Sequence, residues 1–189
     1  MRHTLTITAL AGACAVLGAC ASVDSAAAPA APQPARPVDA ASFYSGVWHE
    51  IGRNPMKLTD GCVAGLTAFM RDADGRLIDR DSCRMDDPVT GKEKVFAGPV
   101  EIDPTNSAKF TTHYKVFGVF TFSRTYWVLD NGSDLGGGWF VTATPDFKNV
   151  STFMRDPQAS AQDRDRLNAR VKALGYDPAG LEFPAQPPR

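Results

Sequence analysis

The chain has 189 residues, and its composition already limits what the protein can be. It holds 20 Lys and Arg against 21 Asp and Glu, which gives a formal net charge of −1. A nucleic-acid binder needs a basic surface to neutralise phosphates, so this balance argues against that class. Hydrophobic residues make up 43% of the chain and aromatic residues 10%, whereas disordered chains are poor in both. The length suits one folded domain with additional segments.

The first twenty residues have the pattern of a lipoprotein leader. Arg2 and His3 precede an apolar stretch of about 13 residues, which is too short to cross a bilayer as a helix. The stretch ends in Leu17-Gly-Ala-Cys20, which resembles the bacterial lipobox. This resemblance predicts a signal peptide over residues 1–19, lipidation of Cys20 and, because no Asp follows the Cys, a place in the outer membrane facing the periplasm. The alternative is an ordinary secretory signal with an incidental Cys.

Two further segments are rich in proline and small residues. Residues 20–42 contain almost no large apolar side chain, and their prolines favour extended polyproline II conformations. We expect them to form a tether that cannot pack a core. A short Pro-rich tail closes the chain at residues 184–189. The folded domain is therefore predicted to cover residues 43–183.

The first part of this domain is a series of short strands separated by turn signals. Asp74-Gly75, for example, is typical of a tight hairpin. The predicted strands cover residues 47–52, 62–70, 76–84, 94–102, 109–116, 124–129, 138–144 and 149–154. Eight such strands with hairpin connections predict an all-β antiparallel meander closed into a barrel or a sandwich. The absence of alternating helices excludes a doubly wound nucleotide-binding fold.

One helix is predicted after the last strand. Ser160-Ala-Gln-Asp163 has the spacing of a capping box. Leu167, Val171 and Leu174 share one face, and Gly175 is suited to end the helix. Because the opposite face is charged, we expect the helix to pack on the outside of the strands.

Cys62 and Cys83 are the two cysteines of the predicted folded domain. The hairpin turn near residue 73 places them about opposite each other on adjacent strands, where a disulfide can form. An oxidising compartment would favour that bond, and two free buried thiols are the alternative. Neither Cys has a His nearby in sequence and no Cys-x₂-Cys spacing occurs, so no metal site is expected.

The segment Tyr44-Ser-Gly-Val-Trp-His-Glu-Ile-Gly-Arg53 resembles the first-strand signature of bacterial lipocalins. Further landmarks with the order and spacing of that family are Gly61-Cys62, Cys83-Arg84, Ala108-Lys-Phe110, Tyr126-Trp-Val-Leu-Asp130, Met154-Arg-Asp-Pro157 and Leu174-Gly-Tyr-Asp177. The turn at residues 131–138 departs from the pattern because it lacks the family's usual Tyr. The resemblance covers about residues 43–183 and implies a Blc-type outer-membrane lipoprotein with an eight-stranded up-and-down lipocalin barrel and one C-terminal helix outside it.

The resemblance also assigns structural roles. Gly46, Trp48 and Arg155 form the signature, in which Trp48 closes the bottom of the barrel and the guanidinium of Arg155 stacks on its indole. Contact between Trp48 and a ligand is the minor alternative. Strand alternation turns Glu50 inward as well. A carboxylate in an apolar lumen is costly unless paired, so Glu50 is either salt-bridged or contacts a polar ligand group.

A barrel of this size encloses room for one small ligand. Aromatic residues gather around the connection predicted at residues 115–124, where they would form an apolar mouth. The residues predicted to bind the ligand are Trp48, Glu50, Tyr114, Phe117, Phe120 and Tyr126.

The lipocalin resemblance implies a binding protein without a cofactor. We expect it to hold a fatty acid or lysophospholipid for lipid storage or transport in envelope maintenance. The alternative is a lipocalin-fold enzyme, an isomerase or de-epoxidase acting on a lipophilic substrate, which would need a polar pair such as His113 and Glu50 inside the barrel. A filled barrel would instead indicate an interaction module. Some relatives are dimers, and the sequence leaves the oligomeric state open.

Overall fold

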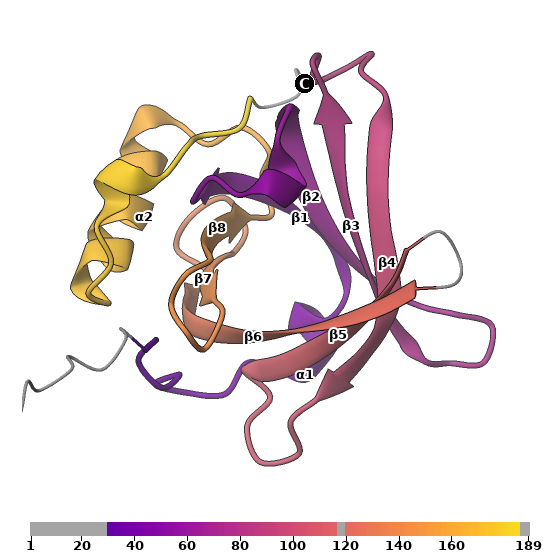
Figure 1. Ribbon diagram of the computed structural model, residues 1–189. Helices are drawn as coiled ribbons and strands as arrows, with labels where there is room; N and C mark the ends of the chain where they lie inside the picture. Colours follow the sequence, from indigo (N-terminus) through magenta and orange to yellow (C-terminus); the bar gives the residue numbers. More distant parts are fainter. Residues whose placement is uncertain (1–29, 117–119, 186–189) are drawn as a thin grey trace, which may run out of the picture.

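The computed structural model describes residues 30–116 and 120–185, which form a closed barrel with a helix on its outside (Figure 1). The strands are β1 (Gly46–Arg53), β2 (Cys62–Arg71), β3 (Leu77–Met85), β4 (Glu93–Ile102), β5 (Lys109–Val116), β6 (Phe120–Gly132), β7 (Trp139–Ala143) and β8 (Val150–Met154). Each strand pairs antiparallel with the next, and β8 pairs with β1. The predicted up-and-down barrel is confirmed. No helix within the described ranges is long and apolar enough to span a membrane.

Aromatic side chains close one end of the barrel. The short helix α1 (Ala40–Phe43), capped by the Asp39 carboxylate, lies at this end. Around it, ring centroids lie 4.9–6.0 Å apart, many of them edge to face, which is a favourable geometry for aromatic pairs. We call this group the aromatic plug; it consists of Phe43, Tyr44, Trp48, Phe69, Phe110 and Phe140. Among the described residues, the connections at residues 54–61, 86–92 and 144–149 lie at the other end, the open end.

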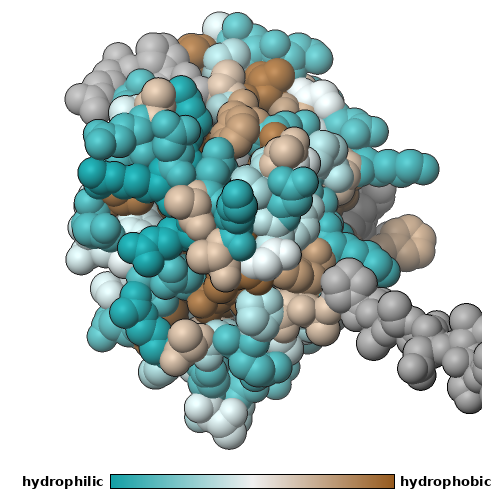
Figure 2. Space-filling model, turned by 90° about the vertical axis from the view of Figure 1, so that its left-hand side faces the viewer, coloured by the Kyte–Doolittle hydropathy of each residue, from teal (hydrophilic) through white to brown (hydrophobic). Residues whose placement is uncertain are grey.

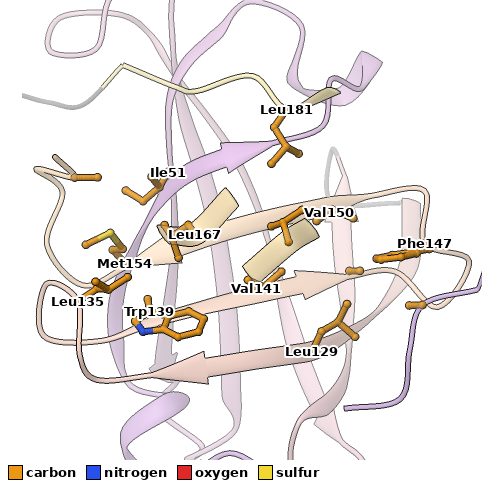
Figure 3. Close-up of a cluster of buried hydrophobic side chains, with 14 residues drawn as sticks. Ile51, Leu129, Leu135, Trp139, Val141, Phe147, Val150, Met154, Leu167 and Leu181 are labelled. Atoms are coloured by element: carbon orange, nitrogen blue, oxygen red, sulfur yellow. The ribbon is translucent and has the colours of Figure 1, made fainter. Parts of the chain in front are cut away.

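Helix α2 (Ala161–Ala173) packs against the outside of the barrel, as predicted. Ser160 and Asp163 form both hydrogen bonds of the capping box. Leu167 and Val171 are fully buried in a second core, together with Trp139, Val141 and other residues of β7 and β8 (Figure 3). The side of the molecule that carries α2 is mostly hydrophilic (Figure 2). After α2, the 3₁₀ turn η2 (Pro178–Gly180) leads the chain back to Arg53 of β1 through a bridge at Glu182.

Strand β6 is longer than the sequence predicts. The sequence suggests a strand over residues 124–129, but β6 begins at Phe120 and runs for 13 residues. In the additional part of β6, Phe122 pairs with Tyr114 and Phe120 with Val116 of β5. The expected connection at residues 115–124 is therefore mainly strand. The prediction was wrong because an aromatic-rich run was taken for a loop, although aromatic residues favour strands.

The Pro-rich segment before β1 is not a free tether along its whole length. From residue 31 it packs along the barrel as an N-terminal arm, with Ala31 and Val38 buried. The Ala31 amide donates to the Pro145 carbonyl (3.0 Å) in the β7–β8 connection, and the Ser107 hydroxyl donates to the Val38 carbonyl (2.6 Å). A segment without large apolar residues can still pack, because its small side chains fit between larger neighbours. The predicted leader and Cys20 lie outside the described residues.

Candidate ligand-binding cavity

A cavity of about 120 Å³ lies inside the barrel between the aromatic plug and η1 (Lys57–Thr59), a 3₁₀ turn at the open end. Its apolar walls include Phe69, Phe96, Phe110, Phe122, Phe140 and Phe153. Polar and charged side chains reach the cavity from all eight strands, among them Glu50, Thr67, Asp81, Lys94, Tyr114, Arg124, Thr142 and Ser151. Aromatic walls combined with convergent polar groups are typical of small-molecule sites.

The structure divides the predicted ligand-binding residues into two groups. Glu50, Tyr114 and Tyr126 line the cavity. Trp48 and Phe120 do not: Trp48 belongs to the aromatic plug, and Phe120 is 69% exposed at the start of β6. Phe120 has the same strand parity as the cavity-lining Phe122 and Arg124, but it is the first residue of β6 and lies beyond the wall of the cavity. Phe117 lies outside the described residues.

Trp48 and Arg155 form the predicted stack at the closed end. The Arg155 guanidinium carbon lies 3.4 Å from the centre of the indole, and its nitrogens donate to the Val47 (2.8 Å) and Ser42 (2.7 Å) carbonyls. The Trp48 Nε1 donates to the Phe43 carbonyl (3.0 Å). Gly46 has φ +69°, a backbone conformation that favours glycine, which explains its place in the signature. These contacts support a structural role for all three residues.

The sequence analysis missed a pair of carboxyl groups on β3. Asp79 and Asp81 both line the cavity, because alternate residues of a strand share a face. The Asp79 carboxylate accepts from Thr112 Oγ1 (2.9 Å), and the Tyr114 hydroxyl lies 2.5 Å from Asp81 Oδ2 and 3.2 Å from Asp79 Oδ2. The Thr67 hydroxyl contacts both carboxylates. Alternation with the apolar Leu77 and Cys83 was the available signal that this face points inward.

Burial makes the carboxyl pair hard to ionise. It raises the pKa of Asp79 to about 6, although the hydroxyls of Thr112 and Tyr114 oppose the shift. It raises the pKa of Asp81 well above its ordinary value, and the charge of Asp79 raises it further. Burial likewise raises the pKa values of Tyr114 and Tyr126, whose hydroxyls lie 3.2 Å apart. The pair therefore holds a proton more readily than surface carboxyls do.

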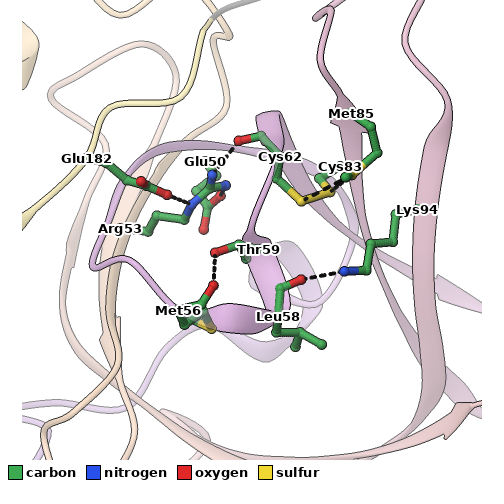
Figure 4. The surroundings of a disulfide bond; sticks show 10 residues. All are labelled: Glu50, Arg53, Met56, Leu58, Thr59, Cys62, Cys83, Met85, Lys94 and Glu182. Atoms are coloured by element: carbon green, nitrogen blue, oxygen red, sulfur yellow. Dashed lines mark hydrogen bonds and ion pairs between the residues drawn. A yellow bond between two sulfur atoms is a disulfide. The ribbon is translucent and has the colours of Figure 1, made fainter.

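Glu50 is the third carboxylate of the cavity, and it is salt-bridged. Arg53, 2% exposed, contacts Glu50 Oε2 through Nη1 (2.6 Å), Glu182 Oε1 through Nε (2.5 Å) and the Cys62 carbonyl through Nη2 (2.6 Å) (Figure 4). The absent Cβ of Gly65 leaves room for the Glu50 carboxylate. Burial raises the pKa of Glu50, and the charge of Arg53 partly offsets that rise.

Arg53 points inward because β1 contains a bulge. The register with β8 shifts between Glu50 and Gly52, so Ile51 is an extra residue and the order of inward and outward positions reverses after it. Simple alternation from Trp48 predicts Arg53 on the outside. The bulge thus places the Arg53 guanidinium beside the buried carboxylate of Glu50.

Cys62 and Cys83 form a disulfide with a Cα–Cα distance of 5.5 Å (Figure 4). The predicted partners are correct, but the predicted register is not. Cys62 pairs with Met85 and Cys83 with Gly65, so the two cysteines are diagonal rather than opposite. A register shift between Cys62 and Ala64 brings them together.

Two cations line the cavity toward the open end. Arg124 Nη1 lies 3.6 Å from the Met56 sulfur, and Lys94 Nζ donates to the Leu58 carbonyl (2.7 Å). Among the described residues, neither forms an ion pair within 4.0 Å. They are therefore suited to receive an anionic group from a ligand.

His113 and Glu50 do not meet inside the barrel. His113 lies on the outer face of β5, where its Nδ1 is hydrogen-bonded to Ser123 Oγ (2.7 Å) and its Nε2 lies 3.4 Å from Glu101. The polar pair required by the enzyme alternative is thus not formed by these residues. In the part of the chain that the structure describes, no group of three His, Cys, Asp or Glu side chains is placed to hold a metal ion.

Comparisons with known proteins agree with this architecture. The barrel is similar to insecticyanin from the tobacco hornworm Manduca sexta (17% identity, 82% of this chain, 84% of that chain, TM-score 0.63). It is also similar to the cockroach allergen Per a 4 (13%, 85% and 96%, TM-score 0.61). A third similar structure is the tryptamine complex of the amine-binding protein of Rhodnius prolixus (13%, 82% and 86%, TM-score 0.56). No curated protein matches the sequence.

The sequence profile of the lipocalin-like domain matches residues 38–186. That range contains all eight strands, the aromatic plug and α2. Lipocalins typically bind small hydrophobic ligands, and the cavity lies where such a barrel holds one. The chain belongs to the lipocalin-like domain family.

Proposed function

We propose that this protein is a lipid-anchored lipocalin of the outer membrane, facing the periplasm, that binds a fatty acid or lysophospholipid for lipid storage or transport in envelope maintenance. The observation that carries the proposal is the aromatic cavity with Arg124 in its wall. The guanidinium has no carboxylate partner within 4.0 Å in the described part of the chain, so it would bind a carboxylate or phosphate well.

The volume of the cavity sets how an acyl ligand would lie. An engineered cavity of about 150 Å³ is known to hold benzene, so about 120 Å³ accommodates only part of a long acyl chain. Part of the chain would pack against the phenylalanine walls, and the rest would leave through the open end. The head group would lie near Arg124 and Lys94.

The course of the N-terminal arm suggests which end of the barrel would face the membrane. The arm meets the barrel at Pro145, in a connection of the open end. Ten residues separate Cys20 from Ala31, and a polyproline II segment of that length would reach about 31 Å. A lipid on Cys20 would therefore hold the membrane close to the open end, where Phe120 and Phe183 are exposed.

Native mass spectrometry of the full chain purified from its own membrane tests both halves of the proposal. We expect a mass increase at Cys20 from bound acyl groups and a co-purified fatty acid or lysophospholipid. An unmodified chain would contradict the anchor, and a chain without ligand that also fails to bind a lipid panel would contradict the lipid class.

The role of Arg124 can be tested separately with Arg124→Gln. The variant should bind palmitate about tenfold more weakly by isothermal titration calorimetry, because a charge-assisted hydrogen bond is lost. Arg76→Gln is the matched control, since Arg76 lies in the exposed β2–β3 hairpin. Equal palmitate affinity in Arg124→Gln and the wild type would rule out Arg124 as the head-group contact.

A further inference from the structure

The cavity encloses two carboxyl groups that the described residues leave without a cation. Asp79 is 2% exposed, and Asp81 keeps part of its surface open to the cavity. Apart from the hydrogen bond between the two carboxyl groups, their partners are the hydroxyl groups of Thr67, Thr112 and Tyr114, which carry no charge. Buried carboxylates in proteins are ordinarily paired with cations. The two carboxyl groups therefore have hydrogen-bond partners, but no cation among the described residues balances their charge.

The cations that line the same cavity are held elsewhere. Arg53 is shared between Glu50 and Glu182. Lys94 donates to a backbone carbonyl at η1, and Arg124 lies against the Met56 sulfur. Among the described residues, none of these three forms an ion pair within 4.0 Å with Asp79 or Asp81.

We infer that the inner part of the cavity binds a small aromatic amine, whose ammonium group lies between Asp79 and Asp81 and whose ring packs among Phe110, Phe122 and Tyr126. The inference rests on the proposed function in one respect only, that the barrel admits a ligand. The two proposed ligands differ in charge. The anionic head group of an acyl ligand would lie near Lys94 and Arg124 in the outer part of the cavity, and the ammonium group near Asp79 and Asp81 in the inner part.

The size and lining of the cavity fit this ligand class. About 120 Å³ is close to the volume that holds a single benzene ring. Tyr114 stacks on Phe122 (5.1 Å) and Phe110 on Tyr126 (5.4 Å), so ring faces border the carboxyl pair. Such faces attract an ammonium group and pack a ligand ring.

Three probes that share a ring and differ in charge test the inference. They are 2-phenylethylamine, the neutral 2-phenylethanol and the anionic 3-phenylpropionate, titrated into the full chain by calorimetry at pH 7.5 after bound lipid is removed. The amine is expected to bind about tenfold to hundredfold more tightly than the alcohol, as an ion-assisted hydrogen bond allows. The anion should bind more weakly than the alcohol if it enters the inner part.

Asp81→Asn should remove the preference for the amine and leave the affinity for the alcohol unchanged. The matched control is Asp74→Asn, because Asp74 lies in the exposed hairpin, 72% exposed. If Asp81→Asn fails to fold, the pH dependence of the wild type replaces it. Protonation of the pair should lower the amine-to-alcohol ratio as the pH falls from 7.5 to 5, through the pKa of Asp79 at about 6. The other charged groups that face the cavity are Glu50, Arg53, Lys94 and Arg124.

Each outcome decides between the two ligand proposals. A wild type that binds the amine no more tightly than the alcohol overturns the inference, and palmitate binding in that case leaves the proposed function in place. Binding of the amine without palmitate supports the inference and overturns the acyl class. Binding of none of the probes, palmitate included, overturns both.

Discussion

The barrel buries carboxylates at two places, and the two places differ in whether a cation of the chain lies beside them. Glu50 on β1 lies 2.6 Å from Arg53, which a second carboxylate and a carbonyl also hold. Asp79 and Asp81 on β3 face the same cavity, where the described residues offer them hydroxyl groups and each other but no cation within 4.0 Å. The first arrangement is neutralised from within the chain, and it secures the gap between β1 and β2 at the open end. The second leaves negative charge that a ligand can neutralise.

The difference assigns a structural role to the carboxylate of Glu50 and a ligand-binding role to the carboxyl groups of Asp79 and Asp81, although all three face one cavity. A neutralised carboxylate contributes to stability and has little charge left for a ligand. A buried pair without a cation lowers stability when it ionises, and a cationic ligand that binds there would offset that cost. The comparison can be tested by removing the cation on one side and the charge on the other.

The largest effect is expected from Arg53→Met. The variant leaves Glu50 and Glu182 without their cation and should lower the free energy of unfolding by about 3–5 kcal/mol. Urea denaturation at pH 7.5 measures it. Arg76→Met is the control, since the exposed Arg76–Asp72 pair should contribute less than about 1 kcal/mol.

A second variant checks the cause of that loss. Adding Glu50→Gln to Arg53→Met should restore part of the stability, because the uncompensated charge is then gone. If the double variant is no more stable than Arg53→Met, the role of Arg53 lies in packing and in the Cys62 carbonyl contact, and the comparison between the two acidic sites fails.

A smaller effect of opposite sign is expected from Asp79→Asn. The folded-state pKa of Asp79, about 6, lies above its ordinary value of 3.8, so the wild type loses stability as the pH rises from about 3.8 to about 6, and the full cost is present at higher pH. The variant should therefore be more stable than the wild type at pH 8, by on the order of 2–3 kcal/mol, and about equal at pH 4. Urea denaturation at both pH values measures the difference.

Asp103→Asn is the control because its sign is reversed. Hydrogen bonds from Thr105 lower the pKa of Asp103, so its contribution is present above pH 3.8 and is lost as the pH falls. Asp103→Asn should thus be less stable than the wild type at pH 8. Stability curves of Asp79→Asn and the wild type that run parallel from pH 4 to pH 8 would show that the carboxyl pair does not ionise as described.

The sequence was sufficient for the architecture because the architecture follows from repeated local patterns. Alternation, hairpin turns and the capping box at Ser160 identify the strands and α2, and the Gly-x-Trp segment identifies the closed end. Alternation also places Glu50 inside, and the aromatic cluster predicts Tyr114 and Tyr126 as ligand contacts; all three line the cavity. Alternation fails where one residue changes the count: Ile51 reverses the direction of Arg53, and a register shift makes the two cysteines diagonal.

The carboxyl pair shows a different limit of sequence reasoning. Asp79 and Asp81 lie on the same face as the buried Leu77 and Cys83, so alternation alone could have turned them inward. Charged residues are almost never fully buried, so residue type and alternation give opposite predictions at these two positions. A conflict of this kind between residue type and predicted face is itself a signal of a functional position.

The smallest expected effect comes from Arg155, a partly exposed cation at the closed end whose partner is a ring rather than a carboxylate. Arg155→Lys keeps the charge but loses the planar stack on Trp48 and one of two carbonyl contacts, which should cost about 1 kcal/mol of unfolding free energy. Because Trp48 does not line the cavity, the affinities for palmitate and 2-phenylethylamine should not change. A shift in either affinity would show that the aromatic plug and the cavity act as one unit, and the contrast between the two acidic sites would then have to include the closed end of the barrel.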